Sequence, residues 1–185
     1  VYGLNMLFTN ATPLGGFTTE YTNVGSGKLL GLSYLVWIAL VVAAITWFIF
    51  NMTRHGKYMY AIGGNPQAAE VAGVPVKLTL ILIYMKAAAM YGLAGFMLGA
   101  KAGGASVNLG YGYEMEAIAA CTIGGVSVTG GRGKVSSAII GVAVFELLKA
   151  ALQYLGVDAN AQYIAIGIVI FVAISLDIRK YVAKK

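Results

Sequence analysis

The sequence has 185 residues, of which 59% are hydrophobic and 11% are charged, whereas about 25% of the residues in ordinary soluble domains are charged. This composition, with a mean hydropathy of +0.78, excludes intrinsic disorder and predicts an all-α, polytopic helical membrane protein. One cysteine and one histidine exclude an internal disulfide framework and give no metal-ligand cluster. No Ser/His/Asp set stands out either, so we expect no catalytic residues, no metal and no cofactor.

Five segments are apolar enough to predict membrane crossings, since a helix needs about 20 residues to cross the hydrocarbon core. The third is the weakest, because only 15 uncharged residues separate Glu116 from Arg132 and they include Gly124-Gly125. A short crossing, a broken helix and a re-entrant segment all fit it. Residues 1–28 are predicted to form an external loop, with the end of an earlier helix as one option for its first eight residues. The five predicted spans are 29–50, 76–100, 115–131, 135–155 and 159–176.

Basic residues between the spans predict the orientation, because cytoplasmic loops are enriched in Lys and Arg. One set of loops, namely 51–75 with the adjoining Lys77, 132–134 and the tail 177–185, holds nine of the 13 basic residues, and the opposite set holds Lys28 and Lys101. The first set is therefore predicted to be cytoplasmic, which places the C-terminus inside. This assignment needs five crossings, including the weak third segment. The net charge of +6 then reports membrane orientation, and no nucleic-acid partner is expected.

Three ionisable residues, Lys86, Glu146 and Lys149, lie within predicted spans, where charges usually face a bundle interior or a water path. Counted from the predicted cytoplasmic ends at 1.5 Å per residue, Lys86 lies roughly 15 Å deep and Glu146 roughly 18 Å deep. An ion pair between these two helices is one prediction. Lys149 is expected either to extend toward the membrane surface or to pair with Glu146 at i, i+3. A structural ion pair and the lining of a polar pathway both remain open.

The run Gly130-Gly131-Arg132-Gly133-Lys134 resembles a phosphate-binding loop but lacks its pattern. Val128 stands where the first glycine is needed, and Val135 stands where Ser or Thr must follow the lysine. A tight cytoplasmic turn between two spans is the prediction.

The loop 51–75 contains a predicted short helix. Asn65 suits its N-cap and Pro66 its first position, Gln67–Ala72 continue it, and Gly73 ends it. Its small face, Ala68 and Ala69, suits docking into a groove of a partner protein, although an ordinary ordered loop explains the pattern equally well.

Three blocks of sequence resemble the permease subunits of bacterial ABC sugar importers, in the ribose and galactoside branch. The first is Tyr60-Ala61-Ile62-Gly63-Gly64-Asn65-Pro66-Gln67-Ala68-Ala69, followed by Gly73; the second runs from Tyr113 through Ala117-Ile118-Ala119-Ala120 to Gly124-Gly125-Val126-Ser127; the third is Leu155-Gly156-Val157 with Gln162-Tyr163. The tail Lys180-Tyr181 with Lys184-Lys185 is similar to the galactose/methyl-galactoside permeases. Lys86 departs from the pattern.

The resemblance implies the C-terminal part of a permease subunit in the bacterial inner membrane. It implies a second permease subunit (a homodimer), two cytoplasmic ATP-binding subunits that receive the helix at Pro66–Ala72, and a periplasmic sugar-binding protein. ATP hydrolysis would belong to the partner, so this chain itself would not be an enzyme. Asn108, Tyr111 and Tyr113 are candidates for the external mouth. An ion-coupled secondary transporter with Lys86 and Glu146 as coupling charges, and a membrane scaffold without transport activity, are the alternatives.

Overall fold

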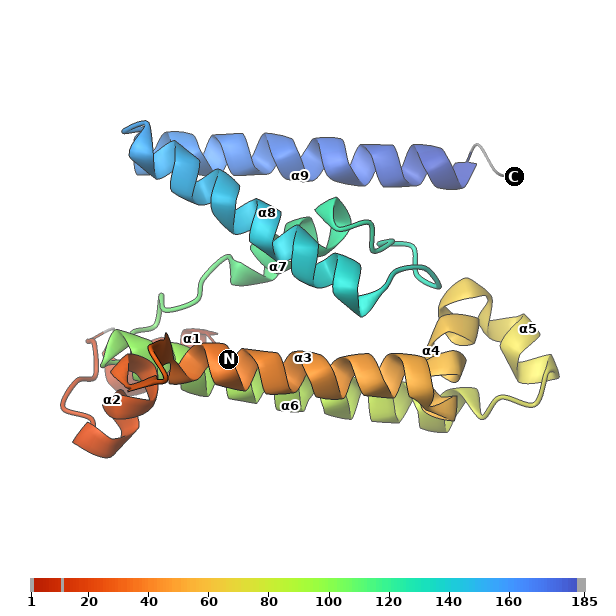
Figure 1. The fold of residues 1–185 in the computed structure, drawn as a ribbon, viewed down its shortest axis with the longest axis horizontal. Helices are drawn as coiled ribbons and strands as arrows, with labels where there is room; N and C mark the ends of the chain where they lie inside the picture. Colours follow the sequence, from red (N-terminus) through yellow and green to blue (C-terminus); the bar gives the residue numbers. More distant parts are fainter. Residues whose placement is uncertain (1, 11, 183–185) are drawn as a thin grey trace. The chain divides into compact units, whose positions relative to one another are not determined.

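The computed structural model describes residues 2–10 and 12–182 of the chain, so the predicted tail residues Lys184 and Lys185 lie outside the described part. The chain, drawn in Figure 1, divides into two units, residues 1–45 with 80–111 and residues 46–79 with 112–185. The described elements are α1 (Tyr2–Thr9), α2 (Thr19–Ser26), β1 (Lys28–Leu29), β2 (Leu32–Ser33), α3 (Tyr34–Met52), α4 (Arg54–Gly64), α5 (Pro66–Val71), α6 (Val76–Ala102), α7 (Tyr113–Ile123), α8 (Val135–Tyr154) and α9 (Ala159–Val182).

Four of the described helices have the length and hydropathy to cross a membrane. They are α3, α6, α8 and the part of α9 between Ala161 and Arg179, and they correspond to four of the five predicted spans. The prediction of a polytopic, all-helical membrane fold is therefore confirmed.

The first span begins five residues later than predicted, because a β-hairpin occupies its start. β1 pairs antiparallel with β2, and the two turn residues Leu30 and Gly31 have φ of 54° and 84°. Two consecutive left-handed residues are typical of the tight turn that suits the twist of a hairpin. Trp37 at the start of α3 donates its indole N–H to the Leu29 carbonyl at 3.1 Å, which ties the hairpin to the helix.

The weak third segment is a short helix followed by non-helical chain. α7 has 11 residues, which at 1.5 Å per residue is about 16 Å long, well below the roughly 30 Å of the hydrocarbon core. Residues 115–131 are therefore not one continuous helix, because α7 ends at Ile123 with Gly124 as its C-cap. That this segment completes a fifth crossing stays a prediction.

In the first unit, α2 packs against the C-terminal part of α6. The Tyr21 hydroxyl donates to the Phe96 carbonyl at 2.8 Å. A Cβ on Gly25 would lie 2.3 Å from the carbonyl oxygen of Ala100, so the two backbones touch there. The predicted loop 1–28 thus contains two helices, α1 and α2. α2 was not expected because its residues, TEYTNVGS, are weak helix formers, and its packing against α6 compensates for this.

In the second unit, α7 packs against both α8 and α9 and supplies the centre of the core (Figure 1). Ala119 is fully buried and packs with Ala120, Phe145 and Ile166. The close approach of α7 and α8 requires glycine, because a Cβ on Gly141 would lie 2.1 Å from the Ala120 carbonyl oxygen. Small residues at such contacts let helix backbones approach within van der Waals distance.

Candidate functional site

The predicted short helix of the 51–75 loop is α5, and its local sequence explains both of its ends. The Asn65 side chain accepts a hydrogen bond from the Ala68 N–H at 3.0 Å, and Pro66 occupies the first turn, where its missing N–H costs nothing. At the other end Gly73 has φ of +83°, and its N–H donates to the Glu70 carbonyl at 3.0 Å. These contacts are the cap and stop that the sequence predicts.

The small face of α5 differs from the prediction, which pairs Ala68 with Ala69. Ala69 is only 4% exposed, whereas Ala68 is exposed. Val71, which the sequence reasoning did not single out, is 91% exposed. The exposed surface of α5 therefore contains Gln67, Ala68 and Val71, while Ala69 is buried within the chain.

A second helix, α4, precedes α5 and was expected to be loop. It begins with the Thr53 side chain, which accepts from the Gly56 N–H at 3.1 Å. Asn65 then serves both helices: its N–H donates to the Ala61 carbonyl at 3.0 Å, which closes α4, while its side chain caps α5. α4 and α5 are thus joined through one residue with no flexible linker.

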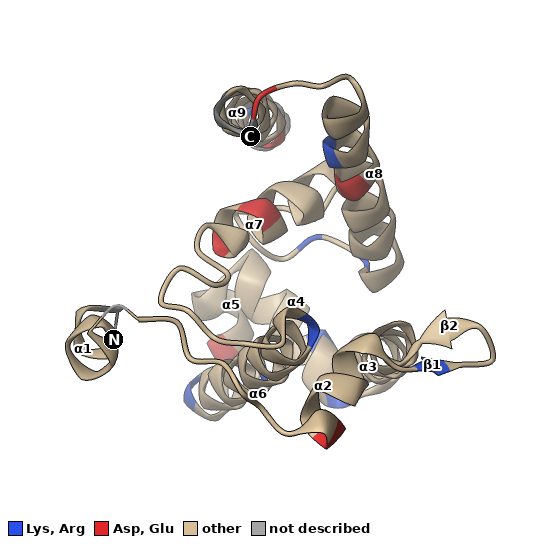
Figure 2. Ribbon diagram, turned by 90° about the vertical axis from the view of Figure 1, so that its left-hand side faces the viewer, with Lys and Arg blue, Asp and Glu red and all other residues tan. Residues whose placement is uncertain are grey.

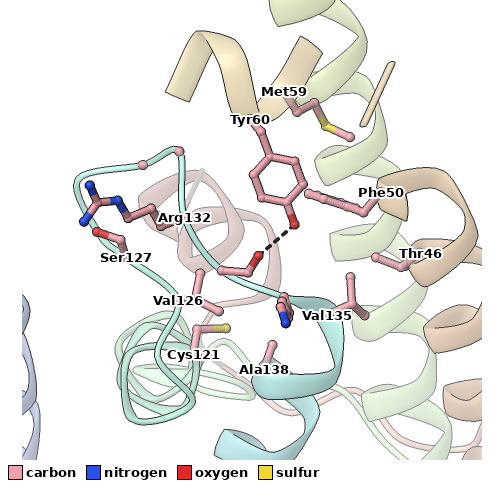
Figure 3. Close-up of a pocket in the computed structure, with 14 residues that line it drawn as sticks. Thr46, Phe50, Met59, Tyr60, Cys121, Val126, Ser127, Arg132, Val135 and Ala138 are labelled. Carbon is pink, nitrogen blue, oxygen red and sulfur yellow. Dashed lines mark hydrogen bonds between the residues drawn. The ribbon is translucent and has the colours of Figure 1, made fainter. Parts of the chain in front are cut away.

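The glycine-rich turn that resembles a phosphate-binding loop contacts α4. The Tyr60 hydroxyl donates to the Gly133 carbonyl at 2.8 Å, and a Cβ on Gly63 would lie 2.5 Å from the Gly131 nitrogen. A cavity of about 330 Å³ opens beside these contacts. Figure 3 shows Tyr60 at the side of the cavity with its hydroxyl directed toward the turn, Phe50 beside it and Arg132 directed away.

The same turn is also held by α9. Asp177 accepts hydrogen bonds from the Ser127 hydroxyl at 2.9 Å and from the Val128 N–H at 3.1 Å. Parts of all three segments predicted to be cytoplasmic, namely α4, the turn before α8 and the start of the tail, therefore meet at one end of the second unit. The basic residues of these segments predicted a cytoplasmic location, but the sequence did not predict that the segments contact one another.

Lys149 of α8 forms an ion-pair cluster with Glu116 of α7 and with Glu146 of α8. Figure 2 shows the basic and acidic positions of these helices in blue and red. The Lys149 ammonium lies 2.7 Å from a Glu116 carboxylate oxygen and 3.9 Å from a Glu146 oxygen. The Lys149 and Glu116 side chains are 22% and 19% exposed, and the Glu146 side chain is 62% exposed. The predicted i, i+3 pair is present, but the shorter contact is with Glu116, which the sequence reasoning did not assign to Lys149. The ring centre of Tyr113 lies 5.9 Å from the same ammonium, a distance at which a cation–π contact is still favourable.

Of the other predicted site residues, Lys86, Asn108 and Tyr111 belong to the first unit, and Tyr113 belongs to the second. Lys86 is half-buried in α6 and belongs to the first unit, whereas Glu146 belongs to the second, so their pairing stays a prediction. Asn108 and Tyr111 share a turn in which the Tyr111 N–H donates to the Asn108 carbonyl at 3.1 Å. Both are exposed, as is Tyr113 at the start of α7. In the described part of the chain, no group of three or more His, Cys, Asp or Glu side chains could hold a metal ion.

The family model and the individual relatives that match this chain are all permease components of transport systems. The model of the family described as "Branched-chain amino acid transport system / permease component" matches residues 3–174. Galactose/methyl galactoside import permease protein MglC of Escherichia coli K12 is 43% identical over 192 aligned positions, which cover 100% of this chain and 57% of MglC. MglC of Treponema pallidum is 37% identical over 100% of this chain and 36% of its own length. Ribose import permease protein RbsC of Escherichia coli K12 is 35% identical over 96% of this chain and 57% of RbsC.

The chain thus spans a little over half the length of MglC and RbsC of Escherichia coli. No solved structure matches it. The family match covers nearly all of the sequence and agrees with the apolar helices that the structure describes. The chain belongs to the family of permease components typified by the branched-chain amino acid transport systems.

Proposed function

We propose that this chain is part of the permease subunit of an ATP-driven importer of a monosaccharide, with galactose or a methyl galactoside as the first candidate. The support is the similarity to sugar import permeases. MglC of Escherichia coli, a galactose/methyl galactoside permease by name, is 43% identical, and the ribose permease RbsC is 35% identical. The order of these identities favours a galactoside over ribose. The permease would provide the path across the membrane and carry out no covalent chemistry.

The observation that carries the coupling part of this proposal is the construction of α5. This helix is fixed at both ends by its caps and held by its buried Ala69, and it leaves Gln67, Ala68 and Val71 exposed. A short, rigidly anchored helix with a small and partly apolar outer face suits insertion into a groove of a partner. We propose that the partner is a cytoplasmic ATP-binding subunit.

The proposed topology has five crossings with the C-terminus in the cytoplasm of a bacterial inner-membrane protein. Contacts within the second unit support it. Lys149 lies 14 residues beyond Val135, about 21 Å along α8, and its partner Glu116 belongs to the first turns of α7. The chain then descends through α7 to the turn at the start of α8, where Tyr60 and Asp177 bind it. Residues 113–134 thus traverse much of the depth of α8 in the opposite direction, as a fifth crossing requires.

The remaining partners follow from the same proposal. A second permease subunit, most simply a second copy, would complete the translocation path, and a periplasmic sugar-binding protein would deliver the sugar to the outer face. Transport would proceed by alternating access, in which closure of the ATP-binding subunits displaces α5 and reorients the helices that follow it.

The test is uptake of labelled galactose into proteoliposomes that contain the full-length permease, its ATP-binding subunit and the sugar-binding protein. Uptake should require ATP inside and the ATP-binding subunit, and should be insensitive to ionophores. Uptake that proceeds without the ATP-binding subunit and stops with an ionophore would instead favour an ion-coupled secondary transporter. Transport of another labelled sugar in place of galactose would change the substrate assignment and leave the ATP-driven mechanism intact.

The docking of α5 has its own test, based on two neighbouring alanines. Ala68→Cys places a thiol on the exposed face, and Ala69→Cys places one at a position that is 4% exposed. A thiol crosslinker should join the first variant, and not the second, to the ATP-binding subunit. If neither variant is crosslinked while ATP-driven uptake persists, α5 is not the docking element.

A further inference from the structure

Two glycine pairs bring α4 into direct backbone contact with the turn that precedes α8. A Cβ on Gly63 would lie 2.5 Å from the Gly131 nitrogen, one on Gly131 would lie 2.7 Å from the Gly64 nitrogen, and one on Gly130 would lie 2.8 Å from the Gly63 carbonyl oxygen. Real Cβ atoms essentially never lie so close to other atoms. The contact therefore exists only because no side chain stands between the two backbones. We call Gly63, Gly130, Gly131 and the Tyr60–Gly133 hydrogen bond the glycine joint; Gly64 meets the turn only through its backbone, and a Cβ on it would meet nothing within 4 Å.

The glycine joint connects α4 and α5 on one side with α8 and α9 on the other. On one side Asn65 closes α4 and caps α5, so a displacement of α5 moves the end of α4. On the other side the turn continues through Lys134 directly into α8. Asp177 of α9 holds the same turn through Ser127 and Val128. The joint is thus the place where the proposed docking helix meets the helices α7, α8 and α9.

We propose that the glycine joint transmits the movement of α5 to α8 and α9, with Gly63 and Tyr60 as its positioning residues. This proposal rests on the proposed function, in which an ATP-binding subunit moves α5. Backbones in contact transmit a push, because they cannot interpenetrate, and the Tyr60–Gly133 hydrogen bond transmits a pull. Packed contacts joined by hydrogen bonds are elements through which energetic coupling between distant sites is carried.

The cavity beside the joint strengthens this assignment. It is lined by Tyr60 and Gly130–Lys134 together with residues such as Phe50 and Cys121, and Figure 3 shows the Tyr60 hydroxyl reaching the turn along one side of it. The unfilled volume of about 330 Å³ leaves room for movement on that side, while the glycine contacts and the Tyr60–Gly133 hydrogen bond connect the turn to α4.

Two adjacent glycines of α4 provide a matched pair of variants. Both lie within the helix, so alanine is compatible with the backbone at either position. In Gly63→Ala the new methyl meets the turn at 2.5 Å, whereas in Gly64→Ala it meets nothing within 4 Å. The measurement is the ratio of sugar transported to ATP hydrolysed by the complete transporter in proteoliposomes. Co-purification of the ATP-binding subunit reports assembly.

We expect Gly63→Ala to lower the transport-to-hydrolysis ratio about 2- to 30-fold, the range over which substitutions in coupling networks act. Gly64→Ala should leave the ratio unchanged, and both variants should retain the ATP-binding subunit. Equal ratios in the two variants would overturn the proposal. A loss of assembly in Gly63→Ala that reduces transport and hydrolysis in proportion would also overturn it, since the residue would then be structural.

Tyr60→Phe removes only the hydroxyl and so tests the Tyr60–Gly133 hydrogen bond independently of the glycine contacts. Tyr58→Phe is its control, because the structure describes no hydrogen bond of the Tyr58 hydroxyl within residues 2–10 and 12–182. The transport-to-hydrolysis ratio should fall in Tyr60→Phe alone; an unchanged ratio would refute the role of the hydrogen bond.

If the unmodified transporter shows no ATP-dependent uptake, the proposed function fails. If its uptake is ATP-driven but the matched variants behave alike, only the joint fails.

Discussion

The ion-pair cluster between α7 and α8 makes a quantitative prediction about the stability of the second unit. Lys149→Met removes the cation and leaves Glu116, whose side chain is 19% exposed, without its 2.7 Å partner. Glu116→Gln removes the anion, but Lys149 then keeps Glu146 at 3.9 Å. Because Glu116 has no second basic partner among the described residues, we expect Lys149→Met to destabilise the protein more than Glu116→Gln.

The size of the effect follows from the distance and the burial. At 2.7 Å and an effective dielectric constant of about 20, the Coulomb attraction is about 6 kcal/mol. Desolvation of both ions cancels much of this attraction, and removal of one partner from a buried pair typically costs about 3–5 kcal/mol. Since Lys149 and Glu116 retain about a fifth of their exposure, we expect a cost of about 2–3 kcal/mol for Lys149→Met.

The assay is a double-mutant cycle, measured as the free energy of unfolding of the full-length permease in mixed micelles with increasing dodecyl sulfate. The double variant Lys149→Met/Glu116→Gln should be less destabilised than the sum of the single variants, with a coupling energy of about 2 kcal/mol. The control is Glu146→Gln, whose carboxylate is 62% exposed. It should cost under about 1 kcal/mol, as is usual for exposed pairs. Strict additivity, or an equal cost for Glu146→Gln and Glu116→Gln, would refute the reasoning.

Three further substitutions test other contacts. Gly141→Ala places a methyl 2.1 Å from a carbonyl oxygen of α7 and should lower the free energy of unfolding by at least about 1–3 kcal/mol. The control is Gly167→Ala in α9, where the methyl meets nothing within 4 Å and should not destabilise the protein. Unfolding in detergent compares the two variants. Asp177→Asn weakens the two hydrogen bonds to the turn before α8 and should speed amide exchange there; unchanged exchange would show that Asp177 does not hold the turn. Asn65→Ala removes the cap of α5 and should cost about 1 kcal/mol locally, seen as faster exchange of the Ala68 N–H than in the unmodified protein.

The sequence predicts best where local chemistry decides the structure. α5 was predicted with its cap and stop because Asn65, Pro66 and Gly73 act within a few residues of one another. The long apolar spans were predictable for the same reason, since each helix satisfies its own backbone. In both cases the deciding interactions lie inside the segment itself.

The sequence predicts poorly where contacts between distant segments decide. α4 includes Gly56, Gly63 and Gly64, which lower intrinsic helix propensity by about 1 kcal/mol each, so it resembled a loop. Burial of Gly56 and Ile62 favours the helix nonetheless. Likewise the i, i+3 spacing predicted Glu146 as the partner of Lys149. The closer partner is 33 residues away and depends on the register of α7 against α8.

The break after α7 has a physical reason in the hydrogen bonds of the turn that follows. A helix continued past Gly124 would bond the backbone groups of this turn internally. In the broken chain the Val128 N–H donates to Asp177 and the Gly133 carbonyl accepts from Tyr60. The Ser127 N–H donates to the Arg132 carbonyl at 3.1 Å, which closes the turn on itself. Irregular backbone at or near a membrane is tolerated where protein groups satisfy it, and here two of those groups belong to α4 and α9. The break that weakens the third span is therefore what frees the turn to bind both helices.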